Sequence, residues 1–154
     1  MTVAFQLNAR NVSCDAAPDT PLLYVLRNDM ALSSPKYGCG AAQCGACRVM
    51  VEGDIAASCV LPLRDAAGKA VVTLEGLGDR SGLHPLQQAF IDEQAAQCGF
   101  CTPGMIMAAA VLLARNPDPS DADIREALER NLCRCGCYPR IVKAVRRAAK
   151  AIAQ

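Results

Sequence analysis

The sequence is poor in residues that would give it enzyme chemistry of its own. Its 154 residues include one histidine, His84, no tryptophan and only 4% aromatic residues. Without a second histidine, a nucleophile–base pair or a glycine-rich phosphate loop, we expect no independent substrate site. Charge is also scarce: 16 Lys and Arg against 15 Asp and Glu give a net charge of +1. This balance excludes the strongly basic face that nucleic acid or an anionic membrane surface would require.

Long hydrophobic runs are absent as well. The longest apolar run, Gly104–Ala114, is much shorter than the about 20 residues that a bilayer span needs, and it predicts a buried helix. The first basic residue is Arg10, and no apolar segment of a secretory signal follows it. We therefore expect no transmembrane segment and no signal peptide. The expected location is the cytoplasm or the cytoplasmic side of the membrane, unless an exported partner carries the chain.

Cysteine is the residue type that the sequence has in abundance, with ten copies. In a reducing compartment such thiols stay free to bind metal instead of forming disulfides. Eight of them form two sets along the chain: Cys39, Cys44, Cys47 and Cys59, then Cys98, Cys101, Cys133 and Cys135. The function should therefore be sought at the cysteines.

We predict an α+β chain of two small domains, the first over residues 1–75. Alternating apolar and polar residues around Asn8 predict a β-hairpin, and Thr20 with Pro21 predicts a helix start for residues 22–28. The expected strands are Val3–Leu7, Asn11–Cys14, Arg48–Glu52, Ile55–Val60 and Val71–Leu74.

After a linker at residues 76–82, the apolar periodicity changes to that of helices. It predicts a four-helix bundle over residues 83–154, because each short amphipathic helix needs the others to bury its stripe. The expected helix starts are Pro85, Thr102, Ser120 and about Pro139. Leu132 of the third helix and Ile152 of the fourth are assigned to the buried stripes.

The first cysteine set has the spacing C-x4-C-x2-C, with a fourth cysteine further on, which matches plant-type 2Fe-2S ferredoxins. Gly38, Gly40 and Gly45 suit a loop whose N–H groups point at anionic sulfurs. A four-cysteine zinc site is the alternative, although such sites more often use paired C-x2-C knuckles.

The second set combines C-x2-C at Cys98 and Cys101 with C-x-C at Cys133 and Cys135. This spacing alone fits either zinc or an iron–sulfur cluster. A Rieske centre needs two histidines, so with only His84 the ligands would all be cysteine. The helix predictions place the four thiols at one end of the bundle, near the N-termini of its second and fourth helices.

Two cysteines and the histidine are left over. Cys14 is expected to be a small buried hydrophobe. His84 is expected at a helix start and not as a ligand or base. Cys137 continues the alternation of Cys133 and Cys135 and is the alternative ligand, but we favour the other two.

Four segments carry a resemblance to a known family: Lys36–Cys39, Cys44–Cys47, Gln97–Gly104 and Asn131–Gly136. They resemble the two-cluster iron–sulfur subunits of the xanthine oxidase family of molybdenum hydroxylases, over nearly the whole chain. Further similarity, to the small subunits of bacterial nicotinate dehydrogenase and isoquinoline 1-oxidoreductase, lies in Leu26–Asp29, Gln87–Gln94 and Cys135–Tyr138. The resemblance implies a plant-type ferredoxin-like β-grasp domain followed by a four-helix bundle, each with one 2Fe-2S cluster.

The resemblance also implies an oxidoreductase whose turnover site lies in another chain. A large subunit with a molybdenum-pterin cofactor would hydroxylate an N-heteroaromatic substrate such as nicotinate. Electrons would leave through the helical-domain cluster and then the plant-type cluster to cytochrome c or a flavin (FAD) subunit. By the family pattern Gln97 and the ligand Cys135 also touch the pterin.

Two positions depart from the family pattern. Arg48 follows Cys47 where related sequences usually have a small residue, and Cys137 stands where close relatives usually carry threonine or another small residue. Neither removes any of the eight expected ligands. Three further functions are considered: the small subunit of an aldehyde-oxidising molybdenum enzyme, a free-standing ferredoxin-like shuttle, and a zinc-stabilised interaction module.

Overall fold

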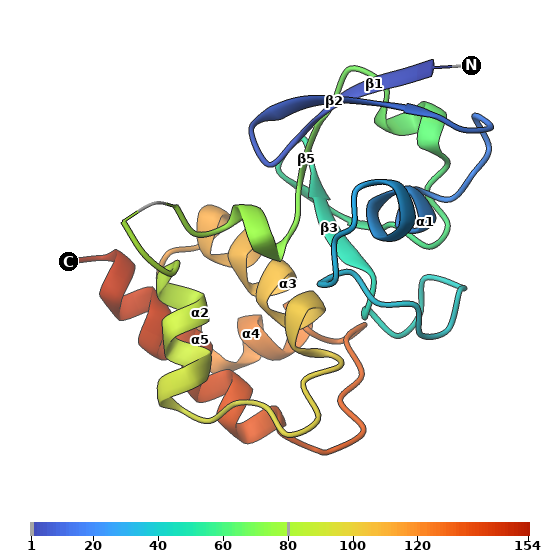
Figure 1. Cartoon of the computed structure of the whole chain (residues 1–154). Helices are drawn as coiled ribbons and strands as arrows, with labels where there is room; N and C mark the ends of the chain where they lie inside the picture. Colours follow the sequence, from blue (N-terminus) through green and yellow to red (C-terminus); the bar gives the residue numbers. More distant parts are fainter. Residues whose placement is uncertain (1, 80) are drawn as a thin grey trace.

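The computed structural model describes residues 2–79 and 81–154 (Figure 1). In these residues a five-stranded sheet belongs to the N-terminal half, and the longer helices of the C-terminal half gather to one side of it (Figure 1). This is the α+β organisation that the sequence predicts.

The sheet is mixed and has the strand order β2-β1-β5-β3-β4. Only β1 and β5 run parallel; the other neighbours are antiparallel. Its strands are β1 (Thr2–Leu7), β2 (Arg10–Asp15), β3 (Arg48–Val51), β4 (Asp54–Ala57) and β5 (Ala70–Val72). The predicted hairpin is confirmed, with Asn8 and Ala9 both at positive φ, as its two-residue turn requires.

Three strands end earlier than predicted, and β3 does so by one residue, at Val51 and not at Glu52. β4 stops at Ala57 and not at Val60, because the N–H groups of Val60 and Leu61 turn back to the carbonyl oxygen of Ala57. β5 stops at Val72, and a short 3-10 helix, η3 (Leu74–Gly76), follows it. The predictions Ile55–Val60 and Val71–Leu74 are therefore too long at their C-terminal ends.

One face of the sheet packs on a short helical segment. The buried side chains Val3, Phe5 and Leu7 of β1 alternate with exposed ones, and they contact α1 (Leu22–Tyr24) and η1 (Val25–Asp29) in one apolar cluster. The helix predicted over residues 22–28 is confirmed, but its second part has π-helical pitch. A further 3-10 helix, η2 (Leu63–Ala66), also lies in this core and was not predicted.

The second half holds the four long helices: α2 (Pro85–Asp92), α3 (Thr102–Arg115), α4 (Asp121–Ala127) and α5 (Tyr138–Ile152). Proline stands in the first turn of α2, α3 and α5. The N–H groups of a first turn have no partner within the helix, so proline, which lacks an N–H, breaks no hydrogen bond there. Ser120 and Asp123 form the predicted capping box of α4.

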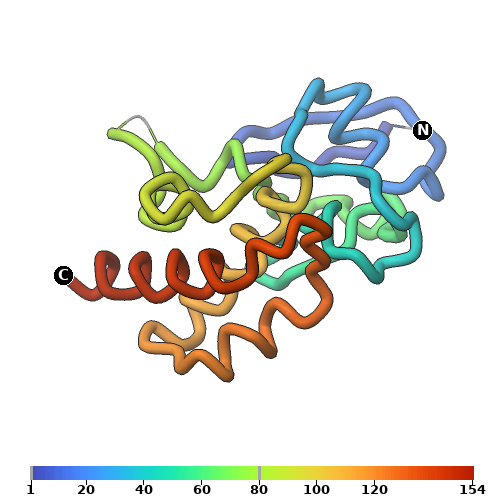
Figure 2. The backbone as a smooth tube through the Cα atoms, turned by 90° about the horizontal axis from the view of Figure 1, so that it is seen from below, coloured from blue at the N-terminus to red at the C-terminus, as the bar shows by residue number. Residues whose placement is uncertain are grey.

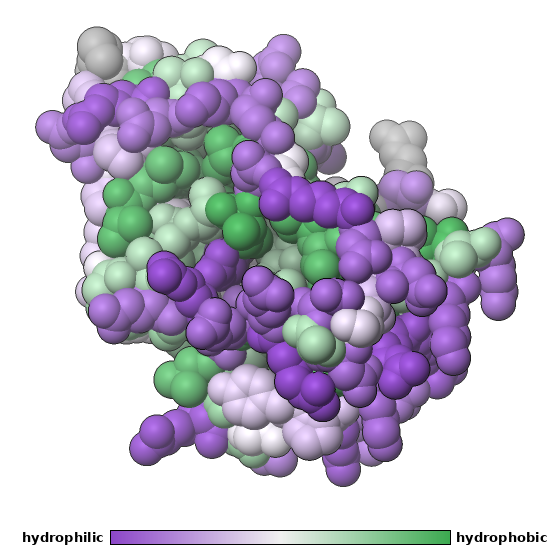
Figure 3. Space-filling model, turned by 180° about the vertical axis from the view of Figure 1, so that it is seen from behind, coloured by the Kyte–Doolittle hydropathy of each residue, from purple (hydrophilic) through white to green (hydrophobic). Residues whose placement is uncertain are grey.

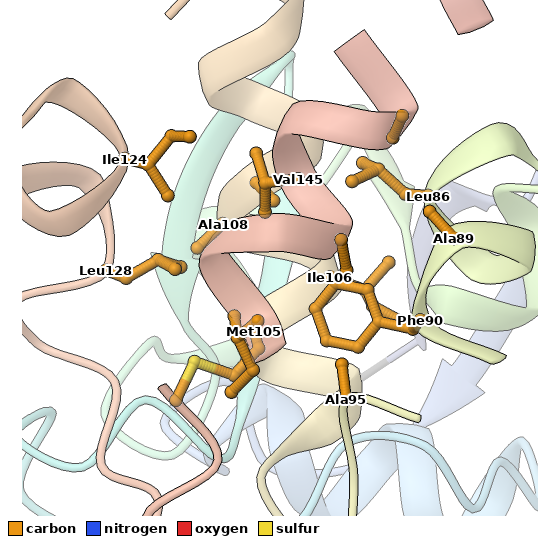
Figure 4. Close-up of a cluster of buried hydrophobic side chains, with 14 of the residues drawn as sticks. Leu86, Ala89, Phe90, Ala95, Met105, Ile106, Ala108, Ile124, Leu128 and Val145 are labelled. Carbon is orange, nitrogen blue, oxygen red and sulfur yellow. The ribbon is translucent and has the colours of Figure 1, made fainter. Parts of the chain in front are cut away.

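A common core joins these helices. Phe90 of α2, Ile106 of α3, Ile124 of α4 and Val145 of α5 belong to one buried cluster, and Figure 4 shows them around α5. Because α3 is apolar on nearly all sides, it also packs against the sheet, where Met50 contacts the same cluster. The central α3 therefore connects the two halves (Figure 1).

Two residues assigned to buried stripes are not buried. α4 ends at Ala127, so Leu132 lies beyond the helix and is 55% exposed. Ile152 is the last residue of α5, and its side chain is 44% exposed. The tube in Figure 2 shows this last turn of α5 projecting at the C-terminus.

The surface is largely polar. The exposed basic face of α5 includes Arg147, which forms ion pairs with Asp92 and Glu93 at the end of α2, at 3.0 Å each.

Where the halves meet, a cleft of about 1180 Å³ has Leu7, Leu74 and other apolar residues in its lining. Seen from behind, the molecule has an apolar hollow bordered by hydrophilic side chains (Figure 3). Within the described residues, no helix combines the length and apolarity needed to cross a membrane.

Candidate metal centres

The first thiol set begins on an exposed loop between η1 and β3. The N–H groups of Ala41, Gln43 and Cys44 all donate to Cys39 Sγ, at 3.3 to 3.4 Å, and the Cys39 N–H donates to Cys44 Sγ at 3.3 Å. The hydrogen bonds that Cys39 Sγ accepts, led by that of Ala41, lower the pKa of Cys39 to about 7. The loop thus presents inward-pointing amides, as the glycine-rich sequence predicts, and also a readily ionised thiol.

Glycine is required in this loop for two separate reasons. A Cβ on Gly38 would lie 2.6 Å from Cys44 Sγ, so a side chain there would displace the thiol. Gly45 has a φ of +75°, which an L side chain rarely adopts, and its Cβ would lie 2.5 Å from the Arg130 carbonyl oxygen. The loop therefore needs both the small residue and the left-handed conformation.

The other two thiols of this set are buried beneath the loop. Cys47 precedes β3 and Cys59 follows β4, and they form a small buried cluster together with Leu23 of α1. Ser58 Oγ donates to the Cys47 carbonyl oxygen at 2.6 Å, which fixes the two segments against each other. Burial raises the pKa of Cys47 to about 11, so a thiolate at this position calls for a positively charged metal partner.

The second set is assembled from two loops of the helical half. Cys98 lies in the loop between α2 and α3, Cys101 is the N-cap of α3, and Cys133 and Cys135 lie between α4 and α5. The Sγ atoms of Cys98 and Cys135 are 3.5 Å apart. The predicted positions at helix ends are therefore correct.

The thiols of this second set differ in how easily they ionise. Hydrogen bonds from the Phe100 backbone and from Cys135 lower the pKa of Cys98. Burial and a hydrogen bond to Cys133 raise the pKa of Cys101 to about 12. Burial acts to raise the pKa of Cys133 too, but hydrogen bonds from Cys137 and Cys101 outweigh it and the pKa is lowered. Each set thus combines an accessible, easily ionised thiol with a buried one.

Both sets divide into two pairs of neighbouring thiols. The first contains Cys39 with Cys44 and Cys47 with Cys59; the second contains Cys98 with Cys135 and Cys101 with Cys133. A 2Fe-2S cluster needs two ligands on each of two irons, which such pairs can supply. The arrangement therefore fits a two-iron cluster in each set.

The two sets face one cavity. It has a volume of about 310 Å³, and the thiols Cys39 and Cys44 of the first set and Cys98 and Cys101 of the second line it. Apart from Arg134 the remaining lining is small or apolar, including Phe100 and Leu132. The geometry therefore brings both thiol sets to the junction of the two halves.

Contacts that the sequence analysis missed hold this junction together. The Leu132 N–H donates to the Cys44 carbonyl oxygen at 2.9 Å. The backbone of Gly45 also packs so closely on Gly104 that a Cβ there would overlap it. Asn131 is 3% exposed beside the same loop. These residues belong to the recognised motifs, but motif spacing does not indicate contacts between distant loops.

Arg48 also lies at this junction. Its N–H donates to the Gly45 carbonyl oxygen at 3.2 Å, and within the described residues its buried Nε has no hydrogen-bond partner. Burial lowers the pKa of the guanidinium, while the neighbouring Cys47 opposes this. Arg48, which stands where related sequences usually have a small residue, thus places a cation next to the first thiol set.

The structure also places the four remaining residues singled out in the sequence. Cys14 is 5% exposed and lies in the core of the sheet half. His84 is the N-cap of α2, and its Nδ1 accepts a hydrogen bond from the Leu86 N–H at 3.1 Å, so the expected helix-start role is confirmed. Gln97 is exposed next to the exposed Cys98. Cys137 is buried as the N-cap of α5, with its N–H 3.4 Å from Cys133 Sγ.

Comparison with known families agrees with this geometry. Residues 5–74 match the 2Fe-2S iron-sulfur cluster binding domain, and residues 73–146 match the 2Fe-2S binding domain. The chain is 58% identical to a nicotinate dehydrogenase subunit of Pseudomonas putida, covering 97% of this chain and 95% of that protein. It is 51% identical to the alpha subunit of isoquinoline 1-oxidoreductase from Brevundimonas diminuta, covering 96% and 97%.

Solved structures show the same fold. Quinoline 2-oxidoreductase from Pseudomonas putida has a chain with a TM-score of 0.94 and 35% identity, and the match covers 99% of this chain and 96% of that one. Aldehyde oxidoreductase from Desulfovibrio desulfuricans gives a TM-score of 0.94 at 41% identity, but this chain spans only 17% of its length. The chain belongs to the iron–sulfur small subunits of the xanthine oxidase family of molybdenum hydroxylases, and is an oxidoreductase subunit with a 2Fe-2S-binding domain in each half.

Proposed function

We propose that the chain passes electrons from the molybdenum-pterin site of a large subunit to an external acceptor during hydroxylation of an N-heteroaromatic compound such as nicotinate. The observation that carries this proposal is the pair of four-thiol sets, each of which contributes two thiols to the lining of one cavity. Two redox centres so close together, in a chain without a substrate site of its own, suit one-electron transfer between partners.

We assign the first 2Fe-2S cluster to Cys39, Cys44, Cys47 and Cys59, and the second to Cys98, Cys101, Cys133 and Cys135. When bound, each cluster accepts and releases one electron at a time. The thiols bind the irons, the amides of the exposed loop stabilise added negative charge, and the buried members exclude water. Two separate apolar cores support a ferredoxin-like β-grasp domain at residues 1–75, a linker at 76–82 and a four-helix bundle at 83–154.

The two ends of the electron path are assigned from exposure and the family pattern. Gln97 and Cys135 would contact the pterin of the large subunit, and Gln97 is exposed, as such a contact requires. Cys39, also exposed, lies on the loop of the other set. This loop would therefore face the acceptor, a cytochrome c or a flavin subunit.

The substrate class rests on the relatives. The nicotinate dehydrogenase and isoquinoline 1-oxidoreductase subunits match over 95% and 97% of their lengths, which favours an N-heteroaromatic substrate. Aldehyde oxidoreductase has the same fold in its corresponding segment, so an aldehyde is the second candidate.

The test uses the complex purified through a tag on this chain. We expect a large molybdenum subunit to copurify and the complex to reduce cytochrome c or a flavin acceptor with nicotinate, isoquinoline or quinoline, but not with aldehydes. Turnover with aldehydes alone would support the second candidate. A folded, metal-loaded chain without a partner would contradict the proposal and support a free shuttle.

Matched cysteine variants separate electron transfer from assembly. Cys44→Ser should abolish acceptor reduction while the large subunit still copurifies, because one ligand of the first cluster is lost. Cys14→Ser removes a buried cysteine from the sheet core, outside both sets, and should retain activity. Equal activity of the Cys44→Ser and wild-type complexes would contradict the assigned path.

A further inference from the structure

Arg48 places a cation on the side of the sheet that faces the helical half. Side chains alternate along β3, and Val49 is buried in the core of the sheet half. Arg48 and Met50 therefore point to the opposite side, where Met50 packs against the core of the helical half and β3 lies beside α3 (Figure 1). The Arg48 side chain is thus directed into the junction of the two halves.

Arg48 and Asn131 meet at one backbone carbonyl of this junction. The Arg48 N–H donates to the Gly45 oxygen at 3.2 Å, and Asn131 Nδ2 donates to the same oxygen at 3.5 Å. Arg48 Nε and Asn131 Oδ1 are both buried, and within the described residues neither atom has a hydrogen-bond partner. The first is a donor and the second an acceptor, so one water molecule that accepts from Arg48 and donates to Asn131 satisfies both.

No carboxylate neutralises this cation. In the part of the chain that the structure describes, Arg48 forms no ion pair with Asp or Glu, and the ionisable groups that act on it are Cys47 and Arg130. A partly buried cation is costly unless an anion lies nearby. A 2Fe-2S cluster held by four thiolates is such an anion, and Cys47, which directly precedes Arg48, is one of its assigned ligands.

We propose that Asn131, through one buried water, holds the Arg48 guanidinium at the junction, and that this charge raises the reduction potential of the first cluster. This rests on the proposed ligand set. Reduction makes the cluster more negative, so a nearby cation stabilises the reduced state more than the oxidised one. Because Arg48 adjoins the ligand Cys47, its charge lies roughly 10 Å or less from the cluster, a distance over which salt screens incompletely.

The proposed effect is that of a fixed charge, because arginine keeps its proton over the whole working pH range. A higher potential of the first cluster favours electron flow from the second cluster to the first. Arg48 would therefore supply part of the driving force toward the acceptor, and Asn131 would be the positioning residue that keeps the charge in place.

The charge is tested with Arg48→Gln and Arg48→Lys in the purified complex. Glutamine keeps an N–H donor but removes the charge, whereas lysine keeps the charge. Each complex is titrated anaerobically with reductant, and the EPR signals of the two clusters are followed separately. The signal missing from a Cys44→Ser complex identifies the first cluster. Lys150→Gln, which removes an exposed cation in the last turn of α5, is the control for net charge.

In Arg48→Gln the first cluster should be harder to reduce by up to about tenfold in the equilibrium constant, which is 59 mV for one electron. Arg48→Lys should stay close to the wild type. The second cluster should shift less, because Arg48 adjoins a ligand of the first cluster only. Four irons per chain show that both clusters are retained. If Arg48→Gln loses iron, Arg48→Met, which keeps the length of the side chain, repeats the comparison.

The water bridge is tested separately. A crystal structure of the wild-type complex should hold a water within hydrogen-bond distance of Arg48 Nε and Asn131 Oδ1. Asn131→Ala should lower the potential of the first cluster when Arg48 is present and leave it unchanged in the Arg48→Gln background, because only a charge can be mispositioned. A purely structural role of Asn131 would shift the potential equally in both backgrounds.

Two results would overturn the charge effect: a first-cluster potential in Arg48→Gln equal to that of the wild type, or a shift of the same size in Lys150→Gln. Equal shifts for Asn131→Ala in the two backgrounds, or a junction without the bridging water, would overturn the positioning by Asn131. A wild-type complex without the first EPR signal would instead overturn the proposed function itself, before any variant is compared.

Discussion

The backbone N–H of Leu132 donates a hydrogen bond to the carbonyl oxygen of Cys44 across 2.9 Å. This bond joins the loop of the first thiol set to the loop that leads into the second. Leu132 lies beyond the end of α4 with its side chain exposed, and its backbone N–H is used in this bond between the two loops. The two sets are thus fixed relative to each other by direct contact, in addition to the chain connection through residues 76–82.

Gly104→Ala should destabilise the protein, although alanine is normally the better helix residue by about 1 kcal/mol. A Cβ on Gly104 would meet the Gly45 carbonyl oxygen, and backbone cannot move aside as a side chain can. We expect a loss of about 1–3 kcal/mol, as for other overpacked contacts, measured as a lower urea midpoint. In Gly68→Ala a Cβ meets open space but φ is +69°, so this variant shows the cost of backbone strain without a clash, whereas Gly104→Ala shows the clash without a left-handed φ. Unchanged stability of Gly104→Ala would contradict the close junction.

His84 should make stability depend on pH near neutrality. Its Nδ1 must be unprotonated to accept the Leu86 N–H, and burial lowers the pKa of His84 from 6.5. The folded state therefore binds the proton less well than the unfolded state. The stability that this hydrogen bond contributes is complete above pH 6.5 and is lost as the pH falls below it.

Cap variants at position 84 test this dependence. His84→Ala should lose about 1 kcal/mol at pH 8, while His84→Asn should keep the cap and remove the pH dependence. Thermal unfolding between pH 5.5 and 8 measures both. A wild-type profile parallel to that of His84→Asn would show that His84 does not titrate with folding.

Glu75 should contribute stability that acid removes. Burial acts to raise its pKa, but hydrogen bonds from the Ser34 side chain and N–H and from Thr73 outweigh it, so the pKa is lowered from 4.5. The contribution is therefore complete above pH 4.5 and lost as the pH falls through the folded value. Glu75→Gln should lower the unfolding midpoint at pH 7, and the difference from wild type should shrink with acid. A difference that is constant with pH would contradict the carboxylate's role.

Tyr138→Phe should loosen the second thiol set and leave the first intact. The variant removes the acceptor of the Cys133 N–H, a bond expected to contribute about 0.5–1.5 kcal/mol. Iron release to a chelator, followed by EPR, should become faster for the second cluster alone. Tyr24→Phe is the control, because the aromatic stacking of Tyr24 on Tyr37 does not need the hydroxyl. Equal release rates in the two variants would contradict the prediction.

The parts of the fold that local sequence determines were predictable. The Asn8 turn, the proline helix starts and the Ser120 capping box each depend on a few neighbouring residues, and the structure has all of them. The position of Leu132 was not predictable, because its N–H bonds to the Cys44 carbonyl oxygen in the other half. The cysteine spacing likewise predicted two sets, but the pairing of Cys98 with Cys135 arises only when two loops far apart in the sequence meet.

The central claim is that this chain holds two 2Fe-2S clusters, and spin counting in the anaerobically reduced protein tests it most directly. We expect two distinguishable EPR signals that together approach about two spins per chain, because each reduced 2Fe-2S cluster contributes one unpaired electron. One spin would leave a single cluster and contradict the assignment of the other set. A folded, zinc-containing protein with no spin would contradict both.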